Sequence, residues 1–158
     1  MRIEGLRLCL GLCALVLGAC SASSADDTIA AAPTKRVLEA PELMVHVIEP
    51  AARGFWKGYS EVLDENGWRD ISPSSEADWK RVEDGAATLM VGGHLLLQPE
   101  YVREPVADWN RLTQQFLELA TEGKAQAENQ SKDAMLVLGE QLDETCDSCH
   151  AQFAPHVN

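Results

Sequence analysis

Residues 131–153 read SKDAMLVLGEQLDETCDSCHAQF and predict a helix that carries both core-facing and chemically reactive side chains. Apolar and small residues recur in it at steps of three and four, which is the spacing of one face of an α-helix. This stripe consists of Ala134, Met135, Leu138, Leu142 and Thr145. The same steps continue through Cys146, Cys149, His150 and Phe153. The helix that buries the stripe is therefore expected to turn two thiols and an imidazole inward.

The segment Cys146-Asp147-Ser148-Cys149-His150 has the Cys-x-x-Cys-His spacing by which a c-type haem is attached. Thiols three residues apart share a helical face and can bond the two vinyl groups along one edge of a haem. The imidazole of His150 then lies over the iron as its proximal axial ligand. The sequence thus predicts one covalent haem c, held by Cys146 and Cys149.

The same residues are compatible with other kinds of site. The two thiols can form a disulfide in an oxidising compartment, or a redox pair. A redox pair of the thioredoxin kind usually lies where a strand meets a helix, whereas this one ends a predicted helix. A zinc site needs about four ligands, which Cys146, Cys149, His150 and His156 could supply, but nothing else in the sequence favours it.

The N-terminus reads as an export signal. A basic start precedes an apolar run at residues 8–19, which is shorter than the ~20 residues that span a bilayer. The segment Leu17-Gly18-Ala19-Cys20 resembles a bacterial lipobox, in which a peptidase cuts before the Cys and lipid is added to it. Residues 1–19 are then a signal peptide, and Cys20 anchors the chain in the periplasm to a bacterial membrane, with the outer membrane favoured. Ordinary cleavage after Ala25 would instead give a soluble periplasmic protein.

The mature chain divides into a tether and one domain. Residues 20–37 begin with the lipidated Cys and are rich in Ala, Ser, Thr and Asp, so they are interpreted as a flexible tether. Residues 38–158 have the length of a single domain. Because Cys9 and Cys13 leave with the signal peptide, only the two motif thiols remain in that domain.

The net charge of the chain is -12. This charge argues against nucleic acid as a partner, since phosphates would be repelled. It favours basic redox proteins as partners through electrostatic steering, with solubility alone as the other explanation.

Three more helices are predicted, at about 41–63, 75–97 and 105–123, and no convincing β pattern is found. The apolar face of the first is Met44, Val45, Ile48, Ala51, Ala52, Phe55, Tyr59 and Val62. The second uses Trp79, Val82, Ala86, Leu89, Met90, Gly93 and Leu97, and the third Trp109, Leu112, Thr113, Phe116, Leu117 and Ala120. Pro50 predicts a kink in the first helix, or two shorter helices. Together the pattern predicts an all-α fold, an antiparallel four-helix bundle with a C-terminal haem.

A four-helix bundle whose last helix ends in Cys-x-x-Cys-His-x-x-Phe resembles the cytochrome c prime family, the class II c-type cytochromes. The resemblance covers about 39–153, and a C-terminal motif is typical of this class because other small c-type cytochromes carry it near the N-terminus. One departure is Ala154, which stands where the family often has a basic residue. The resemblance also allows a homodimer.

Members of that family differ on the distal side of the iron. Some leave it open and bind nitric oxide or carbon monoxide, and others place a Met from the first helix on it and carry electrons. Met44 lies near the centre of the predicted apolar face, whereas His46 lies on the charged face. Met44 is therefore the candidate distal ligand, with core packing as its alternative.

The remaining Met and His residues are assigned elsewhere. Met90 and Met135 are assigned to packing, His94 to the partly buried edge of its helix, and His156 to the surface.

Three functions follow from these alternatives. The preferred one is a non-enzymatic, membrane-tethered electron carrier, since no catalytic acid, base or nucleophile is recognisable. The second is a five-coordinate haem module for nitric oxide or carbon monoxide. The third is an interaction lipoprotein with a disulfide and no haem.

Overall fold

The computed structural model describes residues 37–154, which belong to one compact unit of the chain. The predicted signal peptide, Cys20, most of the tether and His156 lie outside the described residues. No helix among residues 37–154 is long and apolar enough to cross a membrane.

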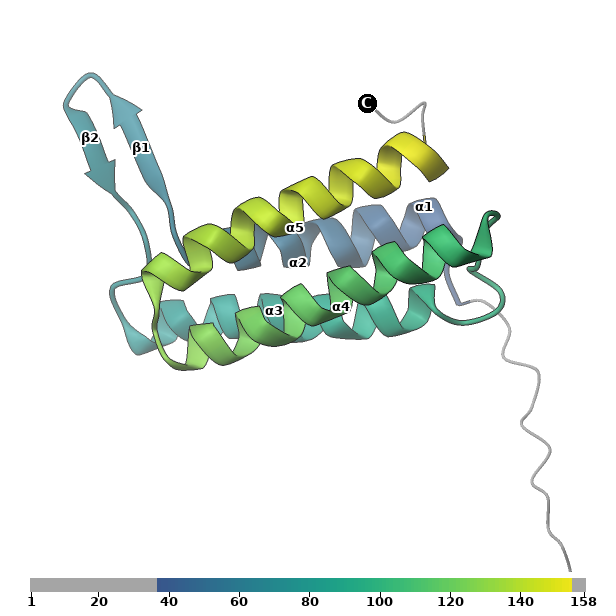
Figure 1. Ribbon diagram of the computed structural model, residues 1–158. Helices are drawn as coiled ribbons and strands as arrows, with labels where there is room; N and C mark the ends of the chain where they lie inside the picture. Colours follow the sequence, from purple (N-terminus) through teal and green to yellow (C-terminus); the bar gives the residue numbers. More distant parts are fainter. Residues whose placement is uncertain (1–36, 155–158) are drawn as a thin grey trace, which may run out of the picture. The chain divides into compact units, whose positions relative to one another are not determined.

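The described part is mostly helical, in agreement with the predicted all-α class, and adds one small hairpin (Figure 1). The first helical segment consists of α1 (Ala40–Leu43), the π-helical turn η1 (Met44–Ile48) and α2 (Glu49–Trp56). The hairpin consists of β1 (Glu61–Asp64) and β2 (Gly67–Asp70). The long helices are α3 (Glu76–Leu96), α4 (Val106–Glu128) and α5 (Lys132–Phe153).

The predicted break at Pro50 takes the form of the π-helical turn. Pro50 has no N–H to give to the carbonyl four residues earlier. Just before it, the N–H of Glu49 bonds the carbonyl of Met44, five residues back. The extra residue in this turn rotates the preceding side chains, so Leu43 is buried while Val45 is 55% exposed. The prediction that Val45 lies on the apolar face was therefore wrong.

The predicted first helix was too long, because residues 61–70 form the hairpin. The strands pair antiparallel with Leu63 opposite Trp68, and Gly67 adopts a φ of 95°, which glycine tolerates without strain. The Ser72 hydroxyl closes the base of the hairpin by accepting the N–H of Ser60 at 2.9 Å. Each strand has only four residues. Strands this short show too little alternation for a sequence pattern to reveal them.

The boundaries of α3 and α5 agree with the prediction. Ser75 caps α3 by accepting the N–H of Asp78 at 3.2 Å, and the Asp78 carboxylate accepts the Ser75 N–H in return. The helix α4 is longer than predicted. It continues past Gly123 to Glu128 because Gly123 serves helix packing and does not end the helix.

Glycines allow the helices to approach one another closely. A Cβ on Gly85 of α3 would lie 2.8 Å from the Ala51 carbonyl oxygen of α2. One on Gly93 would lie 2.6 Å from the Leu117 side chain of α4. One on Gly123 of α4 would overlap the ring of Phe55, 2.0 Å away. These contacts join α2, α3 and α4 around a shared core.

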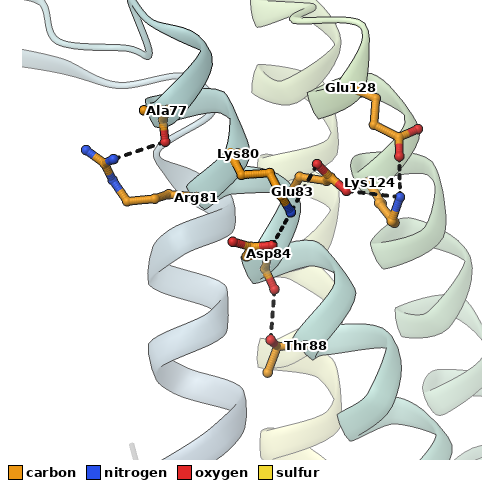
Figure 2. Close-up of polar contacts among 8 residues, drawn as sticks. All are labelled: Ala77, Lys80, Arg81, Glu83, Asp84, Thr88, Lys124 and Glu128. Atoms are coloured by element: carbon orange, nitrogen blue, oxygen red, sulfur yellow. Dashed lines mark hydrogen bonds and ion pairs between the residues drawn. The ribbon is translucent and has the colours of Figure 1, made fainter.

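A polar network lies along the contact between α3 and α4 (Figure 2). Lys124 of α4 lies 3.3 Å from the carboxylate of Glu83 on α3 and also pairs with Glu128 on its own helix. Lys80 lies 3.4 Å from the same Glu83 and pairs with Asp84. Of these pairs only Lys124–Glu83 joins the two helices, and exposed ion pairs of this kind contribute little stability each.

Candidate functional site

The helix α5 buries the stripe that its sequence predicted. Met135, Leu138, Leu142 and Thr145 are buried, and Ala134 is partly buried. The Thr145 hydroxyl donates to the Gln141 carbonyl at 2.8 Å, so this buried polar group is satisfied. The stripe thus fixes the rotation of α5 about its axis, and with it the direction of the residues that follow.

The motif residues continue on the inward side of α5. Cys146, Cys149 and His150 are all partly buried, whereas Asp147 and Ser148 are exposed. One turn further, the ring of Phe153 packs edge-on against Trp109 of α4, with centroids 5.0 Å apart. Both thiols are free of a disulfide. The two thiols and the imidazole therefore share one face of the helix, next to the core.

The surroundings of the thiols make them poor nucleophiles. Burial, reinforced by the charges of Asp143 and Asp147 and by Cys149, raises the pKa of the Cys146 thiol from 9.0 to about 11. Burial also raises the pKa of the Cys149 thiol. Reactive redox pairs need a lowered pKa and an electropositive setting. At this site the pKa of both thiols is raised and the nearby charges on Asp143 and Asp147 are negative, which argues against a redox pair.

The three donors are not arranged as a closed metal site. Among residues 37–154, no group of three His, Cys, Asp or Glu side chains gathers closely enough to hold an ion. A structural zinc ion needs four ligands at about 2.0–2.3 Å from one point. Of the four candidate zinc ligands, His156 lies outside the described residues.

The motif lies at the end of the helical unit where the first helix begins. The Tyr101 hydroxyl, in the α3–α4 connection, donates to the Leu38 carbonyl at 2.7 Å. The Trp109 indole at the start of α4 donates to the Leu96 carbonyl at the end of α3, at 2.8 Å. Since Trp109 also contacts Phe153, the start of α1 and the end of α5 lie at the same end, as Figure 1 shows.

No protein-family model matches this chain, and neither a curated protein nor a solved structure is detectably similar to it.

Met44 lies toward that same end, in the first residue of η1. Its side chain is partly buried and packs against the core, as do those of Val47, Met90 and Cys146. Met44 and Cys146 thus pack against the same hydrophobic core. His46 is exposed, as its place on the charged face predicted.

The other assigned residues fall as follows. Met135 is buried and Met90 partly buried, in keeping with packing roles. His94 is exposed, so the prediction of a partly buried position was wrong. It lies on the rim of a shallow hollow with Glu118 and Glu122 of α4.

Sequence reasoning missed the contact between α2 and α5. The Trp56 indole donates to the Gly139 carbonyl at 3.1 Å, and a Cβ on Gly139 would lie 3.2 Å from the same ring. Trp56 follows Phe55 and so lies about 100° around the helix from it, off the predicted apolar face, yet it is partly buried. The available signal was Gly139, a small residue beside the predicted stripe of α5.

Proposed function

We propose that this chain is a c-type cytochrome that transfers single electrons through one covalently attached haem. The observation that carries the proposal is the joint placement of Cys146, Cys149 and His150. All three are partly buried on one face of α5, and the two thiols are unbridged.

These residues fit a haem better than the alternatives. Thioether attachment needs two thiols spaced along an edge and one imidazole over the metal, not donors converging on a point. The partial burial of both thiols, which raises the pKa of each, and the packing of Cys146 against the core suit a flat, largely apolar group that excludes water from this end.

Each residue then has a separate task. Cys146 and Cys149 would fix one edge of the group, and His150 would hold the iron from the proximal side. When bound, the haem supplies a metal that changes its oxidation state by one electron. The Phe153–Trp109 contact would brace the end of α5, so that the imidazole keeps its direction. Met44 is the proposed distal ligand, and a thioether in that position raises the reduction potential.

The proposed architecture is an antiparallel four-helix bundle of the cytochrome c prime kind. It is supported by the packing of α3 against α2 and α4, and by the contact of α5 with Trp56 and Trp109. Because the haem motif and Met44 are carried by the last and first helices, this topology would place them on either side of one cofactor.

The proposed location is the periplasm, with Cys20 lipidated and residues 20–37 as a tether. The support is the lipobox-like sequence and the need of the motif for an exported chain. A test is metabolic labelling with a palmitate analogue, which should mark the wild-type chain and not C20A. Equal labelling of both chains would exclude this anchor.

An absorption spectrum of the exported protein tests the haem. The pyridine adduct of a doubly thioether-linked haem is expected, and the colour should stay with the chain under denaturing electrophoresis. C146A/C149A should lose the covalent haem, while D147A, which changes an exposed residue of the same motif, should keep it. A colourless wild-type protein whose two thiols react with alkylating reagents would refute the proposal.

The distal ligand decides between electron transfer and gas binding. We expect a low-spin spectrum with a far-red sulfur-to-iron band, which M44A should abolish and H46A should leave unchanged. A high-spin ferrous spectrum that shifts with carbon monoxide in the wild type would favour the five-coordinate alternative. Survival of the band in M44A would exclude Met44 as the ligand.

A further inference from the structure

A hollow with a volume of about 330 Å³ lies between α2 and α5. We call it the α2–α5 groove. Its walls are formed by the rings of Trp56 and Tyr59 and the side chain of Met135, with Glu140 and Asp143 on its rim. It is thus an aromatic and apolar groove edged by carboxylates.

The charged residues that line the groove are both acidic. Glu140 and Asp143 are exposed, and neither forms an ion pair within residues 37–154. The lining contains no Lys or Arg. On the Tyr59 side, Glu61, Asp70 and Asp133 together raise the pKa of the Tyr59 hydroxyl, Glu61 most strongly through a hydrogen bond. Lys132, which precedes Asp133 in the sequence, lies 2.8 Å from Asp70 and is already paired. The exposed Lys57 follows Trp56 in the sequence but does not line the groove.

The aromatic walls and acidic rim of the groove together indicate what kind of group could bind there. Aromatic faces attract a cation, apolar walls accept an alkyl stem, and unpaired carboxylates attract an ammonium or guanidinium head. An anion would be repelled, and a purely apolar ligand would leave the carboxylates unused. A lysine or arginine side chain satisfies all three features.

We propose that the α2–α5 groove is a docking site for a lysine or arginine side chain of a basic partner protein. Gly139 on the groove floor and Cys146 are seven residues apart on one helix. That separation is about 10 Å along the axis. A partner docked here would lie beside the motif. That docking serves electron exchange rests on the proposed function, whereas the binding of a cationic side chain does not depend on it.

The test is calorimetric titration of the exported protein with a lysine octapeptide and with its fully Nε-acetylated form. The lysine peptide should bind and the acetylated peptide should not. E140Q/D143N should weaken binding about ten-fold, the size expected for two rim carboxylates beside an aromatic face. E118Q/E122Q is the matched control, because it removes two carboxylates from the other hollow, which has no aromatic lining. That control should bind like the wild type.

Equal weakening by the control pair would mean attraction to net charge alone and would overturn the proposal. Failure of the lysine peptide to bind, or equal binding of the acetylated peptide, would do the same. If E140Q/D143N fails to fold, W56F replaces it as the test variant. W56F keeps an aromatic ring but loses the hydrogen bond to Gly139, and it should also weaken binding of the lysine peptide. Haem content is measured on the same samples. Lysine binding without haem would refute only the cytochrome, and haem without lysine binding would refute only the docking site.

Discussion

At the scale of single residues, the environment of Cys146 has a consequence that can be measured in the haem-free chain. Its pKa is raised to about 11, mainly by burial, so the thiol remains protonated at pH 8. The thiolate fraction should be about 100-fold below that of an unperturbed cysteine. Alkylation by iodoacetamide at Cys146, followed by mass spectrometry of the C149S chain without its signal peptide, should be correspondingly slow and should accelerate toward about pH 11. A rate at pH 8 equal to that of a free thiol would contradict this environment.

Gly123 should be intolerant of even the smallest side chain. A Cβ there would lie 2.0 Å from the Phe55 ring, and Phe55 is completely buried, so the ring has no free space to enter. Gly123→Ala should lower the free energy of unfolding by about 1–3 kcal/mol in urea titrations, despite the better helix propensity of alanine.

Gly54→Ala is the matched control for Gly123→Ala. The nearest atoms to its added Cβ would lie 3.6 Å away, an ordinary contact. We expect this variant to be neutral or more stable by up to about 1 kcal/mol. If both variants lose stability equally, close packing at Gly123 is not the cause.

At the scale of elements, the start of α3 depends on one reciprocal pair of hydrogen bonds. Ser75→Ala removes the hydroxyl that accepts the Asp78 N–H and should cost about 1 kcal/mol. Ser74→Ala, one residue earlier and outside the cap, should have no measurable effect. Circular dichroism during thermal unfolding compares the two, and an unchanged midpoint for Ser75→Ala would show that water replaces the cap.

The first helical segment shows how one residue can reshape an element. Pro50 cannot donate a backbone hydrogen bond, and the chain accommodates this with the π-helical turn from Met44 to Ile48. Pro50→Ala restores the missing N–H. It should therefore favour regular α-helix, turning Val45 inward and shifting Met44. If Met44 is the distal ligand proposed above, this change should alter the far-red band that such ligation would give, whereas K57A at the end of the segment should leave that band intact.

At the scale of the whole molecule, stability should depend on pH in two opposing ways. The sequence has a pI of about 4.6, so lowering the pH from 7 toward this value relieves repulsion among the acidic side chains. Three carboxyl groups act in the opposite direction at lower pH. The pKa of Asp64 is lowered by Arg69, that of Asp70 by Lys132, and that of Asp78 by Ser75.

Carboxyl groups with a lowered folded-state pKa stabilise the fold above their unfolded value of 3.8, and this stabilisation is lost as the pH falls below it. The thermal midpoint should therefore rise slightly from pH 7 to about 5 and fall steeply below about 4. D70N should reduce the fall of the thermal midpoint below about pH 4. E65Q should not reduce it, because Glu65 is exposed and its carboxyl has no comparable hydrogen bond among the described residues. A midpoint that kept rising below the pI would show that these hydrogen bonds contribute nothing.

Much of the candidate site could be predicted because it is periodic. The four helices, the burial of the α4 stripe, the Ser75 cap and the inward direction of Cys146, Cys149 and His150 all follow from steps of three and four along a helix. These steps act locally, so the sequence alone determined them. The attached haem and the lipidated Cys20 remain predictions of the same sequence.

Only the tertiary structure decided the remainder, because it depends on which elements meet. The hairpin at 61–70 is too short to show a strand period and is closed by a hydroxyl beyond its end. The rotation of Met44 depends on how Pro50 is accommodated. The α2–α5 groove exists because Trp56 packs on Gly139, 83 residues away. Local periodicity carries no information about contacts at that separation. The sequence therefore predicted the direction of the motif side chains, but not the residues from other elements that surround them.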